Sequence, residues 1–300
     1  ALSTSDVATI YNSGVPGDLT GLSPAGWWRM GDNDGGTGTN ITDQGSGSND
    51  GTLTNGPAFS SDVPPSPPKF STLSADLDGS DDYMTCGSVT QINSVTNLST
   101  SSWFKINAYQ GGGGPLILGG QSVAGSNGFY LQALDATTLR YAHQDYGSFN
   151  NFTSLSVPIN TWHNVVTVQA GTDLTVYLNG SSVGTATVTA VDSGWGSNFT
   201  IGKWSGGNFN YMNGHIDEVA LFTSALSASD VSSIYNSGQP ADLTSYSPVG
   251  WWRMGDGTGD TDSGGGTPAN TDTIGTVVDQ GSGGNNATAA NGPTYSSTTP

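Results

Sequence analysis

The chain has 300 residues and a formal charge of −18, because 24 acidic residues stand against six cationic ones. So few cations exclude non-specific nucleic-acid binding, which needs clustered Lys and Arg, and argue against docking onto anionic membranes. The sequence also contains no 18-residue apolar run, so membrane insertion is not expected. Only 34% of residues are hydrophobic, yet 8 Trp, 11 Tyr and 9 Phe can supply a core, and 45 Gly favour short strands joined by turns.

A long internal repeat sets the organisation of the chain. Residues 1–32 and 225–256 are identical at 24 of 32 aligned positions, and residues 43–47 and 55–57 return as 279–283 and 291–293. Self-similarity over this length is typical of a tandem array of domains. We expect the tail and linker of a preceding repeat at 1–23, a complete domain at 24–224, a joint helix and linker at 225–245, and the beginning of the next repeat at 246–300.

The repeated segment predicts a short capped helix followed by a strand. In the second copy Ser227 is a good N-cap, Asp230 lies three residues further on, and Ile234 and Tyr235 fall on one helical stripe. A tryptophan pair begins the following strand in each copy, and neighbouring strand residues point to opposite faces. We therefore expect one tryptophan of each pair to face the core and the other to face the joint. The predicted joint residues are Trp27, Trp28, Ile234, Tyr235, Trp251 and Trp252.

Between the two copies the sequence predicts only strands. Runs of strand-forming residues occur at 103–106, 128–134, 162–168, 174–178, 183–188 and 215–222. Asn179-Gly180 separates two of these runs and indicates a tight hairpin, because both central residues of a type I′ turn need a positive φ. Short, regularly spaced strands with turn residues between them favour an all-β sandwich, jelly roll or barrel.

The order of several motifs resembles the laminin-G-like, concanavalin A-like jelly rolls. The motifs are WWRMGD at 27–32, the Asp-rich stretch at 76–83, Ser102 to Lys105, Thr161 to Val166, Val176 to Gly180, and Ile216 to Phe222. The resemblance implies an all-β fold of two antiparallel sheets in a jelly-roll sandwich, with the first and last strands of the domain paired. The WWRMGD joint also resembles repeats of marine phage and bacterial surface proteins.

The carboxylates argue against an enzyme. A glycoside hydrolase on this fold is the nearest catalytic alternative, and it needs two carboxylates flanking the scissile bond. The only glutamate, Glu218, follows Asp217 directly, and adjacent strand positions point to opposite faces. We expect a non-enzymatic protein.

Calcium is the one cofactor that the sequence suggests. Ca²⁺ takes several oxygen ligands from Asp, Asn and main-chain carbonyls. If the first and last strands pair, as the resemblance implies, a site could form from Asp32, Asp43, Asn49 and Asp217. The cluster Asp78, Asp81 and Asp82 lies in an expected turn and suits either capping or Ca²⁺. The alternative is that these residues only make turns.

Two functions remain open at this stage. The first is adhesion or glycan binding by a tandem module, with Tyr146, Trp195, Trp204 and Phe209 as candidate sugar-stacking residues. The second is a structural fibre or coat subunit whose domains bind mainly neighbouring copies of the same repeat. Both predict an extracellular location, on a cell surface or a virion.

Overall fold

The computed structural model describes residues 2–11, 19–30, 37–59, 70–109, 114–122, 128–143, 148–153, 155–204 and 210–300. The chain divides into two compact units, residues 1–69 and residues 70–300. The described α-helices are α1 (Thr4–Tyr11) and α2 (Ala228–Tyr235), and short 3₁₀ turns lie at Thr20–Leu22, Thr90–Ile92, Asn236–Gly238 and Thr244–Tyr246. Among the described residues, no helix has both the length and the apolar character that crossing a bilayer requires.

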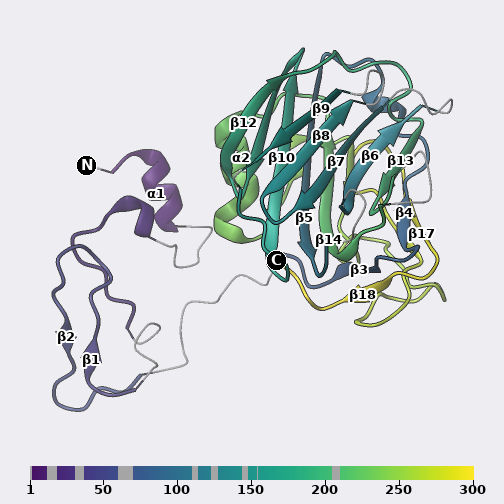
Figure 1. The fold of residues 1–300 in the computed structure, drawn as a ribbon. Helices are drawn as coiled ribbons and strands as arrows, with labels where there is room; N and C mark the ends of the chain where they lie inside the picture. Colours follow the sequence, from purple (N-terminus) through teal and green to yellow (C-terminus); the bar gives the residue numbers. More distant parts are fainter. Residues whose placement is uncertain are drawn as a thin grey trace. The chain divides into compact units, whose positions relative to one another are not determined.

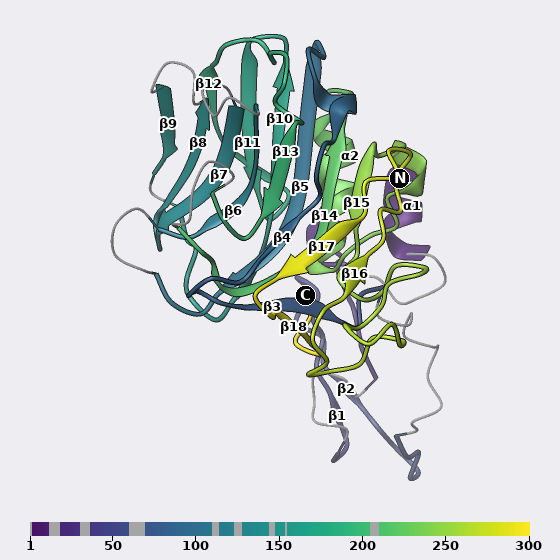
Figure 2. The same ribbon diagram turned by 90° about the vertical axis from the view of Figure 1, so that its right-hand side faces the viewer.

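The larger unit is a sandwich of two antiparallel sheets, so the predicted fold class is confirmed (Figures 1 and 2). The first sheet has the order β12 (Ser181–Thr187), β11 (Asp173–Leu178), β10 (Trp162–Ala170), β5 (Asn97–Ile106), β14 (Asn213–Phe222), β3 (Ser74–Asp78) and β18 (Thr294–Ser296), and β15 (Gly250–Trp252) also pairs with β14. The second has the order β16 (Thr276–Val277), β17 (Ala287–Ala290), β4 (Tyr83–Thr85), β13 (Asn198–Ile201), β6 (Leu116–Gln121), β7 (Gly128–Asp135), β8 (Thr138–His143) and β9 (Ser148–Phe152).

Local sequence explains the predicted hairpin between β11 and β12. Asn179 and Gly180 have φ values of 51° and 76°, the left-handed conformation that this turn requires, so the Asn-Gly prediction is confirmed. Strand β11 buries alternate residues, because Leu174, Val176 and Leu178 face the core. The hairpin therefore fixes the register that places these side chains inside.

Strand β14 (Asn213–Phe222) holds the first sheet together through a bulge. One edge pairs with β5, while the other edge is shared by β3, opposite residues 213–216, and β15, opposite residues 219–221. The register shifts between Asp217 and Ala220, and Glu218 adopts a φ of 48°. A bulge of this kind turns consecutive side chains away from strict alternation. The two acidic side chains thus lie at the junction between β3 and β15.

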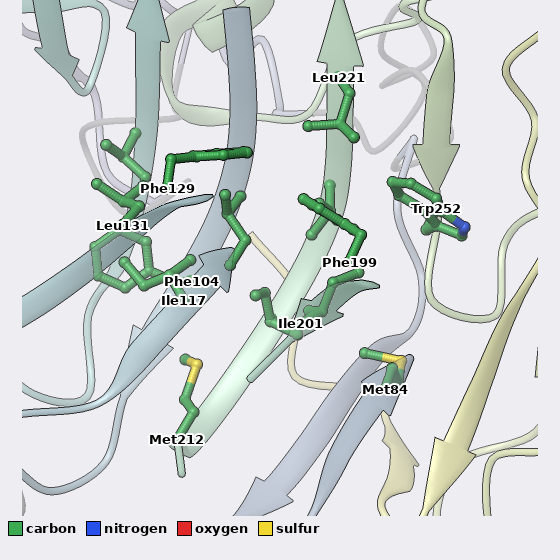
Figure 3. Packing of buried hydrophobic residues seen from close by; sticks show 14 of the residues in the cluster. Met84, Phe104, Ile117, Phe129, Leu131, Phe199, Ile201, Met212, Leu221 and Trp252 are labelled. Carbon is green, nitrogen blue, oxygen red and sulfur yellow. The ribbon is translucent and has the colours of Figure 1, made fainter. Parts of the chain in front are cut away.

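The core lies between the sheets and includes the second tryptophan of the repeated segment. Trp252 is fully buried and stacks on Phe199, with ring centroids 5.6 Å apart. Figure 3 shows these rings beside Met84, so the contact joins residues of β15, β13 and β4. Trp251 faces the other way, among the residues that pack under α2. The prediction of one inward and one outward tryptophan is confirmed for this copy.

Helix α2 (Ala228–Tyr235) covers the outer face of the first sheet. The predicted cap is present, because Ser227 and Asp230 form both hydrogen bonds of a capping box. Val231 and Ile234 are buried in a cluster with residues of β10, β14 and β15. Tyr235 stacks on Trp103 with ring centroids 5.8 Å apart.

The division of the chain differs from the expected boundaries of 24–224 and 246–300. Residues 250–296 supply β15, β16, β17 and β18 to the two sheets of the larger unit. The strand that pairs with β14 therefore comes from the second copy of the repeat, where residues 27–32 were expected. The second copy follows β14 through a short helical connection, so it reaches this edge at high local concentration.

The smaller unit, residues 1–69, contains α1 and a two-stranded pair, β1 (Asn40–Ile41) and β2 (Gly51–Thr52). Trp28 forms an isolated bridge with Asp43. Several large apolar side chains of this unit are exposed, namely Leu2, Val7, Ile10, Trp28 and Met30.

The tryptophans of the two copies should differ in their effect on stability. Trp252→Ala should lower the free energy of unfolding of the larger unit by about 3–5 kcal/mol, because it leaves a cavity beside Phe199. Trp28→Ala is the matched control, since its side chain is 41% exposed, and it should leave that transition unchanged. Differential scanning calorimetry measures both. Equal losses in the two variants would contradict the packing described here.

Candidate functional site

An acidic turn lies at the edge of the sandwich where the chain passes from one sheet to the other. The turn joins β3 of the first sheet to β4 of the second and contains Asp78, Asp81 and Asp82. Carboxylate oxygens of the three residues lie within 4.8 Å of one another. Gly79 has a φ of 79°, which allows the tight reversal that brings them together. The sequence identified this cluster as a turn suited to capping or Ca²⁺.

A second crossing, from β17 to β18, lies beside the acidic turn. Asn291 donates a hydrogen bond from Nδ2 to the carbonyl oxygen of Asp81, with a distance of 2.8 Å. The two crossings enclose an open depression of about 270 Å³. Its lining residues are Asp76, Asp78, Asp82, Asn291, Gly292 and Thr294.

The carboxylates of the turn differ in their electrostatics. The backbone N–H of Ser80 donates to Asp78 at 2.7 Å and lowers the pKa of that carboxyl. Burial raises the pKa of Asp82, and the negative charges of Asp78, Asp81 and Asp76 add to the rise. Among the described residues, no cationic side chain forms an ion pair with Asp78, Asp81 or Asp82. In the part of the chain that the structure describes, the turn therefore concentrates negative charge that no ion pair neutralises.

The donor set of the turn fits a hard cation. Ca²⁺ takes six to eight oxygen ligands at flexible geometry, whereas Zn²⁺ and softer metals favour His and Cys. The three carboxylates, with Asp76 and Asn291 at the rim, offer only oxygen atoms and an amide. The depression is open, so waters or ligand hydroxyls can complete a coordination shell.

The predicted metal ligands Asp43 and Asn49 instead organise a loop. The carboxylate of Asp43 accepts backbone hydrogen bonds from Trp27, Gly45 and Asn49 at 2.8–2.9 Å. The bond from Asn49 is the largest influence, and together these bonds lower the pKa of Asp43. Both carboxylate oxygens are thus already engaged. Asp32 lies outside the described residues.

Asp217 belongs to the other unit and is fully buried. Burial raises its pKa well above the usual value, and the charge of Glu218 adds to this rise. Asp217 shares a hydrogen bond with the hydroxyl of Ser71, which itself donates to the carbonyl oxygen of Leu73 at 3.2 Å. A serine hydroxyl has one proton, so Ser71 can donate to both oxygens only by sharing it. A protonated Asp217 carboxyl could instead donate to Ser71 while Ser71 donates to Leu73.

Glu218 is held by two partners at the bulge. Its carboxylate accepts hydrogen bonds from Arg253 Nε at 3.0 Å and from Trp251 Nε1 at 2.7 Å. Burial raises its pKa to about 7, while Arg253 and Trp251 act in the opposite direction. The side chain is 2% exposed, so this carboxylate is a structural anchor and has no open face for a substrate.

The predicted sugar-stacking residues fall into three groups. Trp195 is 0% exposed and stacks on Phe129 with ring centroids 5.3 Å apart. The assignment of Trp195 to a ligand surface is therefore corrected, because a ring enclosed by the core cannot stack on a sugar. Trp204 is half-buried and meets Tyr130 edge-on at 4.5 Å. Tyr146 and Phe209 lie outside the described residues.

Trp204 lies beside a polar row that the sequence analysis missed. Gln132, Arg140 and Asn151 are directly opposite one another on β7, β8 and β9. Their neighbours Leu131, Leu139 and Phe152 face the core, so the row lies on the outer face of the sheet. Gln132 is nevertheless buried there and donates from Nε2 to the carbonyl oxygen of Gly114. Arg140 Nε donates to Asn151 Oδ1 at 2.9 Å. Strict alternation along these strands was the signal that could have identified this row.

Comparison with known proteins places the chain in a family. Residues 78–232, just over half of the chain, match the Concanavalin A-like lectin/glucanases superfamily. The chain belongs to this family, and the resemblance in fold inferred from the motifs is confirmed. A search of curated protein sequences finds no match.

Several solved structures have a similar fold. A protein from Bacteroides ovatus to which carbohydrate binding is ascribed has a TM-score of 0.56 at 16% identity, with 85% of this chain and 67% of that chain covered. A native heptameric SAP-like pentraxin from Limulus polyphemus has a TM-score of 0.45 at 17% identity, covering 56% of this chain and 83% of that one. The CBM40 of the Ruminococcus gnavus IT-sialidase, bound to alpha2,3 sialyllactose, has a TM-score of 0.43 at 11% identity, covering 55% and 99%.

The buried carboxyl of Asp217 should make stability depend on pH. Its pKa is raised in the folded state, so the folded protein holds a proton that the unfolded chain releases near pH 4, and the free energy of unfolding should fall as the pH rises from about 4. Glu218 should act in the same direction between about pH 4.5 and 7. Asp217→Asn preserves the bonds to Ser71 and Glu218 without the titrating proton.

We expect Asp217→Asn to reduce the difference in unfolding free energy between pH 5 and pH 7 by an amount on the order of 1 kcal/mol. Urea denaturation at the two pH values measures this difference. Asp173→Asn, at an exposed position of β11, is the control and should retain the wild-type dependence. An unchanged pH dependence in the Asp217→Asn variant would show that this carboxyl is ionised in the folded protein.

Proposed function

We propose that the chain is a non-enzymatic, Ca²⁺-assisted glycan-binding module, displayed outside a cell or on a virion. The observation that carries the proposal is the acidic turn, whose Asp78 and Asp82 line an open depression. Among the described residues, its three carboxylates have no cationic partner in an ion pair. Burial is the main cause of the raised pKa of Asp82, and a bound cation would offset both the burial and the repulsion from Asp78, Asp81 and Asp76 that adds to it. Sugar hydroxyls are oxygen ligands and could complete its coordination shell.

The surroundings of the turn suit a sugar. Tyr83 directly follows Asp82 in the chain, and its ring centroid lies 6.4 Å from that of Tyr211. The ammonium of Lys203 lies 3.9 Å from the centroid of the Tyr83 ring, so this ring is already oriented by a cation–π contact. A ring beside a bound cation would offer the sugar an apolar face, while the cation would bind its hydroxyls. Because the depression is acidic, neutral glycans are the favoured class.

The fold is consistent with binding and does not decide between binding and catalysis. Carbohydrate binding is ascribed to the Bacteroides ovatus protein of the same fold. In this chain the only glutamate is buried and engaged by Arg253 and Trp251, which supports a non-catalytic role. A purely structural role in a fibre or coat is the second candidate, and the exposed apolar residues of the smaller unit favour it.

Calcium should raise the melting temperature of the larger unit. A ligand that binds only the folded state stabilises it by about 2.7 kcal/mol at one hundred times its dissociation constant. We expect this increase when Ca²⁺ is added to EDTA-treated protein, and its loss in the double variant Asp78→Asn, Asp81→Asn. Asp173→Asn, which removes one exposed carboxylate of β11 away from the turn, serves as the control and should keep the wild-type response. The same response in the double variant and the wild type would place the cation elsewhere.

Glycan binding should require the same carboxylates. On an array of neutral glycans, EDTA and the double variant Asp78→Asn, Asp81→Asn should each abolish the signal, because the cation then no longer anchors the sugar hydroxyls. Trp204→Ala should leave the signal intact. Loss of binding in Trp204→Ala, with no effect of EDTA, would instead place the sugar on the outward face of β7 and β8. Absence of binding in all conditions would favour the structural role.

A further inference from the structure

In its described residues, 2–11, 19–30 and 37–59, the first copy of the repeat has the local conformation of the corresponding residues of the second copy, within 226–295. Ser3 and Asp6 form the reciprocal hydrogen bonds that Ser227 and Asp230 form at the start of α2. The left-handed residues also correspond. The φ values are 48° at Ser23 and 52° at Ser247, 51° at Met30 and 46° at Met254, and 63° at Asn55 and 68° at Asn291.

The loop after the tryptophan pair is the same in both copies. Asp43 accepts from the backbone of Trp27 at 2.8 Å, as Asp279 does from that of Trp251. The second tryptophan of each pair donates from Nε1 at 2.8 Å to a backbone oxygen, that of Asn49 in the first copy and Asn285 in the second. The described parts of the first copy therefore share the local turns and hydrogen bonds of the element that closes the sandwich.

The two copies differ in what covers their apolar side chains. In the first copy the exposed fractions are 56% for Leu2, 54% for Val7, 38% for Ile10, 41% for Trp28 and 67% for Met30. Their counterparts in the second copy are 7% for Leu226, 0% for Val231, 1% for Ile234, 0% for Trp252 and 0% for Met254. Most of the large exposed hydrophobics among the described residues thus belong to one element whose twin is buried.

The sandwich itself covers the second copy. Trp252 and Met254 enter the main core between the sheets, while Leu226, Val231 and Ile234 lie against the outer face of the first sheet. Arg253 pairs with Glu218 and donates from Nη2 to the backbone oxygen of Phe70. The surface of the sandwich that is complementary to these residues is therefore the one that the second copy contacts.

We propose that residues 2–59 form a second closing element, which docks onto the 70–222 sandwich of another copy of this protein in the place that residues 225–296 take in their own chain. Residues 2–59 are assigned to this binding position because their sequence closely matches that of the second copy. Between residues 1–32 and 225–256 only eight positions differ, and the arginine that meets Glu218 is retained as Arg29. Arg29 also stacks over Trp27 at 5.6 Å, as Arg253 does over Trp251 at 5.3 Å.

Docking onto a complete sandwich requires exchange. The second copy is joined to its own sandwich by a short connection, so it competes at a high effective concentration. A sandwich whose own second copy is weakened accepts the first copy of another chain, which links the chains head to tail as in domain swapping. This proposal does not depend on glycan or calcium binding.

Cross-linking between two full-length variants tests the docking. In the acceptor, Trp252→Asp and Met254→Asp weaken the binding of its own second copy to the sandwich. Trp28→Asp and Met30→Asp prevent its own first copy from docking. Asp76→Cys supplies the thiol for cross-linking. The donor carries Ala58→Cys, the position equivalent to Thr294, which pairs with Asp76. Both carry Cys86→Ala. Asp76→Cys with Thr294→Cys in one otherwise native chain is the positive control.

We expect a cross-linked heterodimer with a short bis-maleimide after the two chains are refolded together. The same donor with Trp28→Asp and Met30→Asp should give none. Failure to obtain the heterodimer, whether the acceptor stays soluble or precipitates, overturns the proposal.

Replacing one copy by the other provides an independent measurement. A full-length variant in which residues 225–256 carry the sequence of residues 1–32 should retain the melting temperature of the larger unit to within roughly 4 °C, because the fully buried residues of this segment are shared. Of the hydrophobic residues packed against the sandwich only Tyr246 and Val249, both partly buried, change, to Leu and Ala. Loss of the cooperative transition in this variant would show that the first copy does not fit the place, and would overturn the proposal even if the glycan site functions.

Discussion

The structure of the larger unit depends on one buried ion pair at a bulge. Arg253 of the repeated segment reaches Glu218 of β14 at 3.0 Å, where β3 and β15 share the edge of that strand. The same guanidinium lies 4.0 Å from the centre of the Phe70 ring, so it also holds the segment that leads into β3. Removing one partner from a buried pair leaves an uncompensated charge, which is strongly destabilising. The pair therefore requires that a segment closing this edge carry an arginine at this position.

Sequence reasoning predicted an all-β fold because strand alternation, the Asn179-Gly180 turn and the capped helix at 228–235 are local features. The resemblance to the laminin-G-like jelly rolls implied the two-sheet sandwich. Neither predicted which copy of the repeat completes the sheet. Both copies contain the same tryptophan pair and the same arginine, so no local property distinguishes them. The outcome depends on chain connectivity, since residues 225–296 follow β14 directly. A repeat thus makes local patterns reliable and long-range pairing ambiguous.

The roles of single aspartates were also not predictable from local sequence. Asp43, Asp217 and Asp81 are chemically identical, yet the first is saturated by backbone N–H groups, the second is buried beside Ser71, and the third lies exposed on the acidic turn. What separates a loop organiser from a candidate ligand is the number of donors already aimed at it. That number is set by tertiary turns, which composition and spacing do not reveal. The sequence could name the acidic turn but could not rank it above the other candidates.

The tryptophan pair explains why the repeated element exposes apolar surface when it is not packed against a sheet. Adjacent strand residues point to opposite faces, so Trp252 enters the core while Trp251 packs under α2, and the segment is held from both sides of the sheet. An element built to be covered on two faces exposes both when no sheet is present, as Trp28 and Ile10 do. Exposed apolar groups of this size favour association. Because the surface that matches them is carried by every copy of the chain, the association they favour is with another copy, and it repeats in one direction.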